Sequence, residues 1–202
     1  MNKFFYVYII YIKMLPEWKK KIIEENRGKN VAFVHAPKCA GSFVNRYCQD
    51  LGIKSLGHNQ ATNDPNTFYF SVIRDPVSRF ESFLNFRLGH NNKFTFRKQL
   101  HHVFHKKSIT LNQIVNKMNR PDFYRFKPYR TLEYWIKGCH ILITIDELFD
   151  FFRELGHENF TIYAKENVSP KLRGKLNEKN IQRLTNIFKK DIEIYQHWTR
   201  SD

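Results

Sequence analysis

Cysteine is scarce in this chain, and its arrangement excludes two kinds of small protein. Only three of the 202 residues are cysteines, Cys39, Cys48 and Cys139, and no pair has the short spacing of a metal-binding motif. An odd and small number of cysteines also argues against a disulfide framework, which needs several bridges. One bridge between two of these thiols stays open. The length and the 42% of hydrophobic residues favour a fold stabilised by a sizeable core.

A long hydrophobic run is also missing. The most apolar segment spans residues 4–12, which is shorter than the roughly 20 residues that a helix needs to cross a bilayer. The segment also lacks the small-residue cleavage site of a secretory signal. We expect a short strand or packing segment here, with peripheral contact to a membrane as the alternative. A soluble cytoplasmic protein is favoured over a Golgi-type membrane-anchored one.

Acidic residues are the third shortage. The chain holds 19 Asp and Glu against 34 Lys and Arg, and its formal net charge is +15. Such a balance favours anionic partners, among them nucleic acid, a phosphorylated cofactor, an acidic glycan or a membrane surface. A biased base composition of the gene explains the same charge, so the charge alone selects no partner.

Alternating hydrophobic patterns predict an α/β fold. We treat residues 1–202 as a single domain, with 1–28 as an N-terminal extension and 29–202 as the core. The patterns predict strands over residues 31–36, 53–56, 67–73, 141–145 and 160–163, and helices over 18–25, 43–51, 76–89, 111–118, 131–137, 147–155 and 177–198. Strands that alternate with helices indicate a three-layer domain, with a mainly parallel central sheet flanked by helices.

The first candidate site follows the strand at 31–36. A turn with Lys38 and Gly41 leads into a helix that we expect Ser42 to cap. The first N–H groups of a helix have no partner within it, and the helix dipole adds partial positive charge there. Lys38 supplies a full charge beside them. The segment therefore predicts an anion site.

Two further residues are expected at the same edge of the sheet. His58 and Arg74 each follow a predicted strand, as Lys38 does. Ligands of parallel sheets bind at the carboxyl ends of the strands, so the fold would bring these distant residues together.

The order of residues in the first motif separates it from the common triphosphate-binding loop. That loop places its lysine after the second glycine, whereas here the order is Pro37-Lys38-x-x-Gly41-Ser42. This order resembles the 5'-phosphosulfate-binding loop of sulfotransferases that use 3'-phosphoadenylyl sulfate (PAPS), and its Pro-Lys-x-Ala-Gly-Ser form is most similar to the carbohydrate branch. In a second motif, Arg74 and Ser82 stand eight positions apart, which resembles the family's 3'-phosphate-binding segment.

The resemblance implies a P-loop NTPase-like sulfotransferase fold and a function. The enzyme would transfer a sulfuryl group from PAPS to a hydroxyl or amine, with a glycan as the favoured acceptor and without a metal. Lys38 would neutralise charge at the breaking bond. The implied donor-binding residues are Pro37, Lys38, Cys39, Ala40, Gly41, Ser42, Phe43, Arg74, Ser82, Lys171 and Arg173.

Other segments resemble the family more weakly. Residues 126–130 are similar to its substrate-side segment, although Tyr129 stands where the family often has Gln. The basic loop with Lys171 and Arg173 is similar to the late loop that closes over the nucleotide. A solvated basic turn is the plain alternative for that loop.

A general base must take the proton of the acceptor, and His58 is our candidate. It follows the second predicted strand, and an unperturbed imidazole titrates near 6.5, so it is largely neutral at physiological pH. A turn histidine without a role is the alternative. His35 is the competing candidate for the base, and Glu147 is a third.

Three alternative readings stay open. The histidines His101, His102 and His105 have helical metal-ligand spacing, but no carboxylate or cysteine completes a set, so a basic face is favoured. A nucleotide or small-molecule kinase on a related scaffold would need an acidic metal ligand, for which Asp75 is available. A non-enzymatic polyanion-binding protein would use the net charge alone, and nucleic acid is the less favoured partner.

Overall fold

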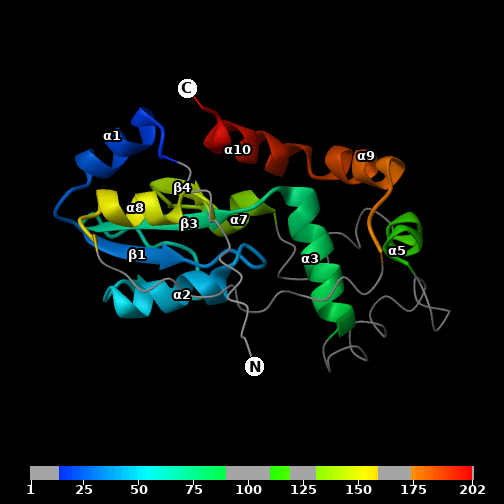
Figure 1. Ribbon diagram of the computed structural model, residues 1–202, viewed down its shortest axis with the longest axis horizontal. Helices are drawn as coiled ribbons and strands as arrows, with labels where there is room; N and C mark the ends of the chain where they lie inside the picture. Colours follow the sequence, from blue (N-terminus) through cyan, green and yellow to red (C-terminus); the bar gives the residue numbers. More distant parts are fainter. Residues whose placement is uncertain (1–13, 90–109, 119–130, 159–173, 202) are drawn as a thin grey trace, which may run out of the picture.

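The computed structural model describes residues 14–89, 110–118, 131–158 and 174–201, and it has an α/β architecture (Figure 1). Its sheet has four strands, all parallel, in the order β2-β1-β3-β4. The α/β class and the parallel sheet are therefore confirmed. The strands are β1 (Asn30–Val34), β2 (Lys54–Ser55), β3 (Thr67–Ile73) and β4 (Ile141–Thr144).

Eight helices lie within the described residues. They are α1 (Glu17–Glu25), α2 (Gly41–Asp50), α3 (Pro76–Gly89), α5 (Leu111–Lys117), α7 (Leu132–Ile136), α8 (Leu148–Glu154), α9 (Glu178–Ile187) and α10 (Lys189–Thr199). None of these helices is long and apolar enough to cross a membrane. Thr110-Leu111-Asn112-Gln113 has the sequence of a capping box, and α5 begins with one, because the side chains of Thr110 and Gln113 each accept from the backbone N–H of the other residue.

The strand order places a change of direction of the chain between β1 and β3. The chain runs from β1 outward to β2 and then returns to form β3 on the other side of β1. Val34 pairs with Ser71, whose hydroxyl donates to the Val34 carbonyl oxygen at 2.7 Å. The connections after β1 and β3 thus leave the sheet in opposite directions. This is the topological switch point at which parallel α/β sheets bind ligands.

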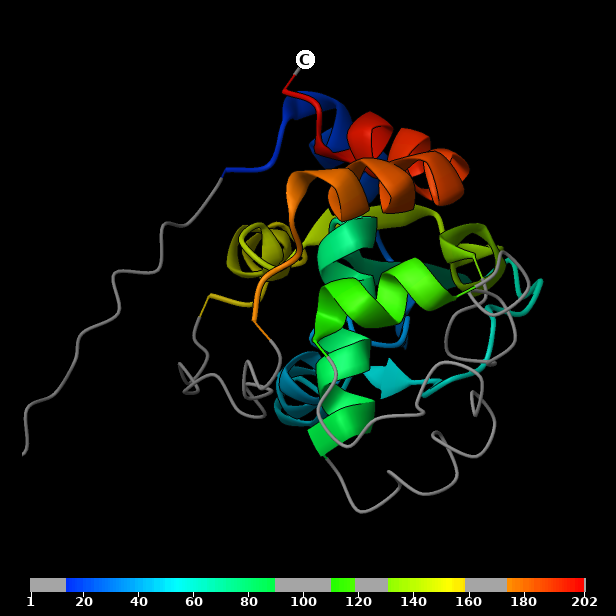
Figure 2. The ribbon, with the colours of Figure 1, turned by 90° about the vertical axis from the view of Figure 1, so that its right-hand side faces the viewer.

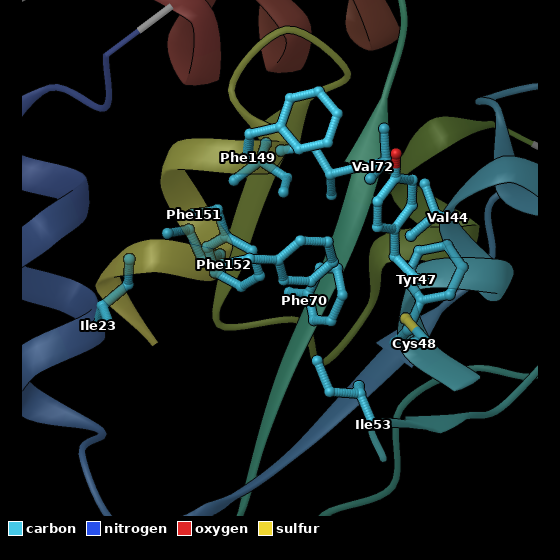
Figure 3. Close-up of a cluster of buried hydrophobic side chains, with 14 of the residues drawn as sticks. Ile23, Val44, Tyr47, Cys48, Ile53, Phe70, Val72, Phe149, Phe151 and Phe152 are labelled. Carbon is cyan, nitrogen blue, oxygen red and sulfur yellow. The ribbon is translucent and has the colours of Figure 1, made fainter. Parts of the chain in front are cut away.

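One face of the sheet packs against α1, α2 and α8. Phe70 of β3 lies between Tyr47 of α2 and the phenylalanines of α8, with its ring centroid 4.7 Å from that of Phe151 (Figure 3). Every residue of β3 is buried, because helices cover both faces of the sheet. This explains why β3 lacks the polar alternation of a half-exposed strand.

The other face of the sheet packs against α7 and α10. Trp135 and Leu132 of α7 lie with Ile73 and Leu142 of the sheet in one buried cluster, and Tyr195 of α10 packs against it. A separate apolar cluster joins α3, α5 and α9 on the side where β3 ends (Figure 2). α3 thus connects the edge of the sheet with the outer helices.

Two predictions about helix ends were wrong. Ser42 does not cap α2, because the helix begins at Gly41 after Ala40, whose φ of 59° is left-handed. The predicted single helix over 177–198 is broken at Phe188, which lies between α9 and α10 with φ −98° and ψ 22°. α9 packs on α3 and α5, and α10 packs on α7, β4 and α3.

Two predictions about which residues are buried differ from the structure. Part of the expected N-terminal extension packs into the main core, where Leu15 and Ile23 are buried. Ile181, which the helical pattern predicts to face inward, is 42% exposed. The strand predicted at 160–163 lies outside the described residues.

Candidate functional site

The loop between β1 and α2 has an unusual backbone. Lys38 and Ala40 are the described residues other than glycine with positive φ, at 66° and 59°. Side chains with a Cβ rarely adopt this conformation, and such strain clusters at sites that bind ligands. The loop leads from the end of β1 to the start of α2, next to the switch point between β1 and β3.

Some backbone donors of this loop are already used. The N–H groups of Phe43 and Val44 both donate to the Ala40 carbonyl oxygen, and that of Cys39 donates to Ala36. For Gly41 and Ser42, the described residues contain no acceptor of the backbone N–H. The N–H groups of Gly41 and Ser42 are therefore available to an anion at the start of α2. The N–H groups of Cys39 and Phe43, two of the predicted donor-binding residues, already donate to carbonyl oxygens of the loop.

Gly41 is required by a close approach to His35. A Cβ at position 41 would lie 1.7 Å from His35 Nε2, far inside van der Waals contact. The start of α2 thus rests on the imidazole of His35. Burial, helped by the nearby His58 and Lys38, lowers the pKa of His35 to about 4, so its ring is neutral at pH 7.

We expect Gly41→Ala to lower the free energy of unfolding by about 1–3 kcal/mol, because an added methyl group forces the loop and the imidazole apart. Urea denaturation of the purified variant measures this change. In a background that already carries His35→Ala, the same substitution should cost much less. An equal cost in both backgrounds would contradict the close contact.

Lys38 and Arg74 follow the ends of β1 and β3, which pair with each other in the sheet. Burial and the positive charge of Arg74 both lower the pKa of Lys38. Burial raises the pKa of the nearby Cys39 thiol, and the positive charges of Arg79 and Arg74 oppose this change. In the part of the chain that the structure describes, neither Lys38 nor Arg74 pairs with a carboxylate. Two neighbouring cations without such a partner favour an anionic ligand.

α3 runs beside this loop and contacts it at two points. Arg79 Nε donates to the Pro37 carbonyl oxygen at 3.0 Å, and Lys38 Nζ lies 4.1 Å from the centroid of the Phe86 ring. Residues three, four and seven positions apart share one side of a helix. Ser82 therefore lies on the same side of α3, between the two contacts, and its hydroxyl is half-buried there.

Arg79 is a functional-site residue that the sequence reasoning missed. It is only 6% exposed, and its guanidinium lies 3.8 Å from Asp191 of α10 while it holds the Pro37 carbonyl. Burial raises the pKa of Asp191, and the positive charge of Arg79 opposes this change. Nothing in the sequence distinguished it from Arg87, the other arginine of α3.

His58 has a defined tautomer. Its Nδ1 lies 3.1 Å from the His35 carbonyl oxygen, which only accepts, so Nδ1 carries the proton. In the neutral ring the lone pair is then on Nε2. The ring is exposed and lies 4.2 Å from that of His35, centroid to centroid. Nε2 of His58 is therefore on an exposed ring, whereas His35 is packed beneath the loop against Gly41.

Two acidic candidates have structural partners. Glu147 pairs with Lys19 at 2.8 Å, with the two side chains 1% and 0% exposed, and also accepts from the backbone N–H of Thr144. Asp75 Oδ1 accepts from the backbone N–H of Ser78 and so caps the start of α3. These contacts assign Glu147 to the core rather than to proton transfer, and they engage the carboxylate that a kinase would need for its metal.

We compared the chain with known proteins. No known protein family, curated protein or solved structure matches the chain. The interpretation of the site therefore rests on its residues.

Several predicted residues lie outside the described part of the chain. These are Lys171, Arg173, the histidines His101, His102 and His105, and the segment 126–130. Among the described residues no group of three or more metal-binding side chains occurs. Cys39, Cys48 and Cys139 are all unpaired, and burial raises the pKa of each thiol.

Proposed function

We propose that the protein is a sulfotransferase of the P-loop NTPase-like fold that transfers a sulfuryl group from PAPS to a hydroxyl or amine, with a glycan as the favoured acceptor. The juxtaposition of Lys38 and Arg74 carries this proposal. They come from two motifs 36 positions apart and follow the ends of the paired strands β1 and β3, and the charge of Arg74 contributes to the lowered pKa of Lys38. A donor with separated 5' and 3' phosphates requires two such anion-binding groups.

The 5' end of the donor would bind at the loop. The N–H groups at the start of α2 face the 5'-phosphate, and Lys38 stabilises the charge that develops on it as the bond to sulfur breaks. The 3'-phosphate would bind Arg74, whose planar guanidinium can make two parallel hydrogen bonds, and the Ser82 hydroxyl. Lys171 and Arg173 are proposed to complete this second phosphate site.

The transfer needs one proton movement. His58 Nε2 takes the proton of the acceptor hydroxyl as the acceptor oxygen bonds to sulfur. The bond between sulfur and the 5'-phosphate oxygen breaks, and its electron pair stays with 3'-phosphoadenosine 5'-phosphate (PAP). All atoms of the reaction come from the donor and acceptor, and no step requires a metal.

The experiment that tests the function uses radiolabelled PAPS with a panel of glycans, and calorimetry with PAP. We expect label transfer to at least one glycan, unaffected by a metal chelator, and one PAP site per chain. Absence of both transfer and PAP binding would contradict the proposal. ATP binding that displaces PAP would instead support a kinase.

The net charge of +15 favours a second candidate, a protein that binds polyanions without catalysis. Such binding falls steeply with salt. It predicts that Arg74→Ala weakens heparin binding no more than Lys54→Ala, which removes an exposed lysine of β2. A much larger effect at Arg74 would favour the nucleotide site.

We expect His58→Gln to lower kcat by about 100- to 10,000-fold, the range typical of a lost general base. PAP affinity should change little, because the imidazole acts on the acceptor rather than on the nucleotide. Initial rates and calorimetry separate the two effects. The matched control is His157→Gln, which replaces a half-buried histidine after α8. An unchanged kcat in His58→Gln would contradict the role of His58 and favour His35 as the general base.

A further inference from the structure

The ring of Phe86 makes a close contact with Lys38 that neither phosphate-binding motif includes. The ammonium nitrogen lies 4.1 Å from the ring centroid, well within the distance at which a cation is attracted to the face of an aromatic ring. Phe86 is seven residues after Arg79, which holds the neighbouring Pro37 carbonyl. α3 therefore fixes the backbone before Lys38 with one side chain and the end of Lys38 with another.

A half-buried ammonium needs such a contact. Burial and the charge of Arg74 both act against the protonated form of Lys38 and lower its pKa. The negative face of an aromatic ring stabilises the cation without neutralising it. A carboxylate in the same place would compete with a phosphate group for the ammonium. The ring covers one side of the ammonium and leaves N–H groups to donate elsewhere.

We propose that Phe86 is a positioning residue, whose ring holds the Lys38 ammonium charged and directed toward a phosphate group bound at the start of α2. This inference rests on the proposed function for the identity of the phosphate, but the contact itself does not depend on the donor. Phe86 touches neither substrate nor donor in this role and acts through Lys38. The effect of the ring on Lys38 should depend on the electron density of the ring face more than on the volume of the side chain.

The test replaces Phe86 with phenylalanines that carry one, two or three fluorine atoms, introduced at this codon alone. Fluorine withdraws electrons from the ring face and changes the shape of the side chain little. We expect PAP and inorganic pyrophosphate to bind progressively more weakly, by about 3- to 10-fold at three fluorines. The pKa of Lys38, measured by NMR with labelled lysine, should fall in the same order.

The matched control is the same series at Phe83, which is 2% exposed in the apolar cluster of α3, α5 and α9. Fluorination there should leave both the lysine pKa and anion binding unchanged. A flat series at Phe86, or equal effects at the two positions, would overturn the inference.

The outcomes also separate this inference from the proposed function. A falling Lys38 pKa and weaker pyrophosphate binding, in a protein that does not bind PAP, would support the role of Phe86 and contradict the proposed donor. PAP binding and transfer that are insensitive to fluorination would support the donor and contradict the role of Phe86.

Discussion

Lys38→Ala is expected to slow sulfuryl transfer by about 100- to 1,000-fold, the loss typical of removing one group that stabilises developing charge. The ammonium lies beside the start of α2, where the 5'-phosphate takes up negative charge as the bond to sulfur breaks. It is half-buried, so water replaces it poorly. Initial rates with labelled PAPS give kcat and KM for the variant.

The comparison for this prediction is Lys54→Ala, which removes the same charge from an exposed position on β2. Its transfer rate should stay within about twofold of the unmodified protein, because exposed charges are strongly screened. Equal losses in the two variants would mean that Lys38 acts only through the overall charge. Lys38→Arg is expected to bind PAP yet transfer slowly, because a planar guanidinium cannot occupy the place of a compact ammonium.

Lys19→Ala is expected to lower the free energy of unfolding by about 3–5 kcal/mol, the cost of breaking a buried ion pair from one side. Lys19 Nζ donates to both carboxylate oxygens of Glu147, at 2.9 and 2.8 Å, and both side chains are almost fully buried. The substitution leaves Glu147 charged in the core without its partner. Urea denaturation followed by tryptophan fluorescence measures the loss.

Two further variants make this prediction specific. Lys20→Ala removes the neighbouring lysine, whose partner Glu17 is at the surface, and should have a far smaller effect. The double variant Lys19→Met/Glu147→Leu should recover most of the stability, because it removes both charges and keeps apolar volume. If Lys19→Ala proved as mild as Lys20→Ala, the ion pair would not anchor α1 to the rest of the fold.

The ion pair also places α1 within the domain. Lys19 of α1 reaches the turn after β4, and the backbone N–H of Leu15 donates to Asp150 of α8 at 2.7 Å. The sequence pattern predicts that α1 belongs to an N-terminal extension, because no neighbouring residue indicates what Lys19 contacts. Its partner lies 128 positions further along the chain.

The strongest elements could be predicted because their signals are local. Six of the seven residues of β3 have high strand propensity and form it over the predicted range, and the proline at position 76 opens α3 as expected. The parallel sheet followed from strands that alternate with helices. The break at Phe188 could not be predicted, because the helical pattern of apolar residues continues through it.

The sequence by itself determined the local parts of the site, namely a strand that ends in a basic turn before a helix and an arginine that ends a second strand. It did not determine that Arg79 holds Pro37, that Phe86 covers Lys38, or that the His35 carbonyl sets the tautomer of His58. Each of these contacts joins residues that are far apart along the chain or on different elements. They form only once the order β2-β1-β3-β4 and the two covered faces place the elements side by side. Periodicity within one segment cannot specify that order, because it reports which side of an element is buried but not against what.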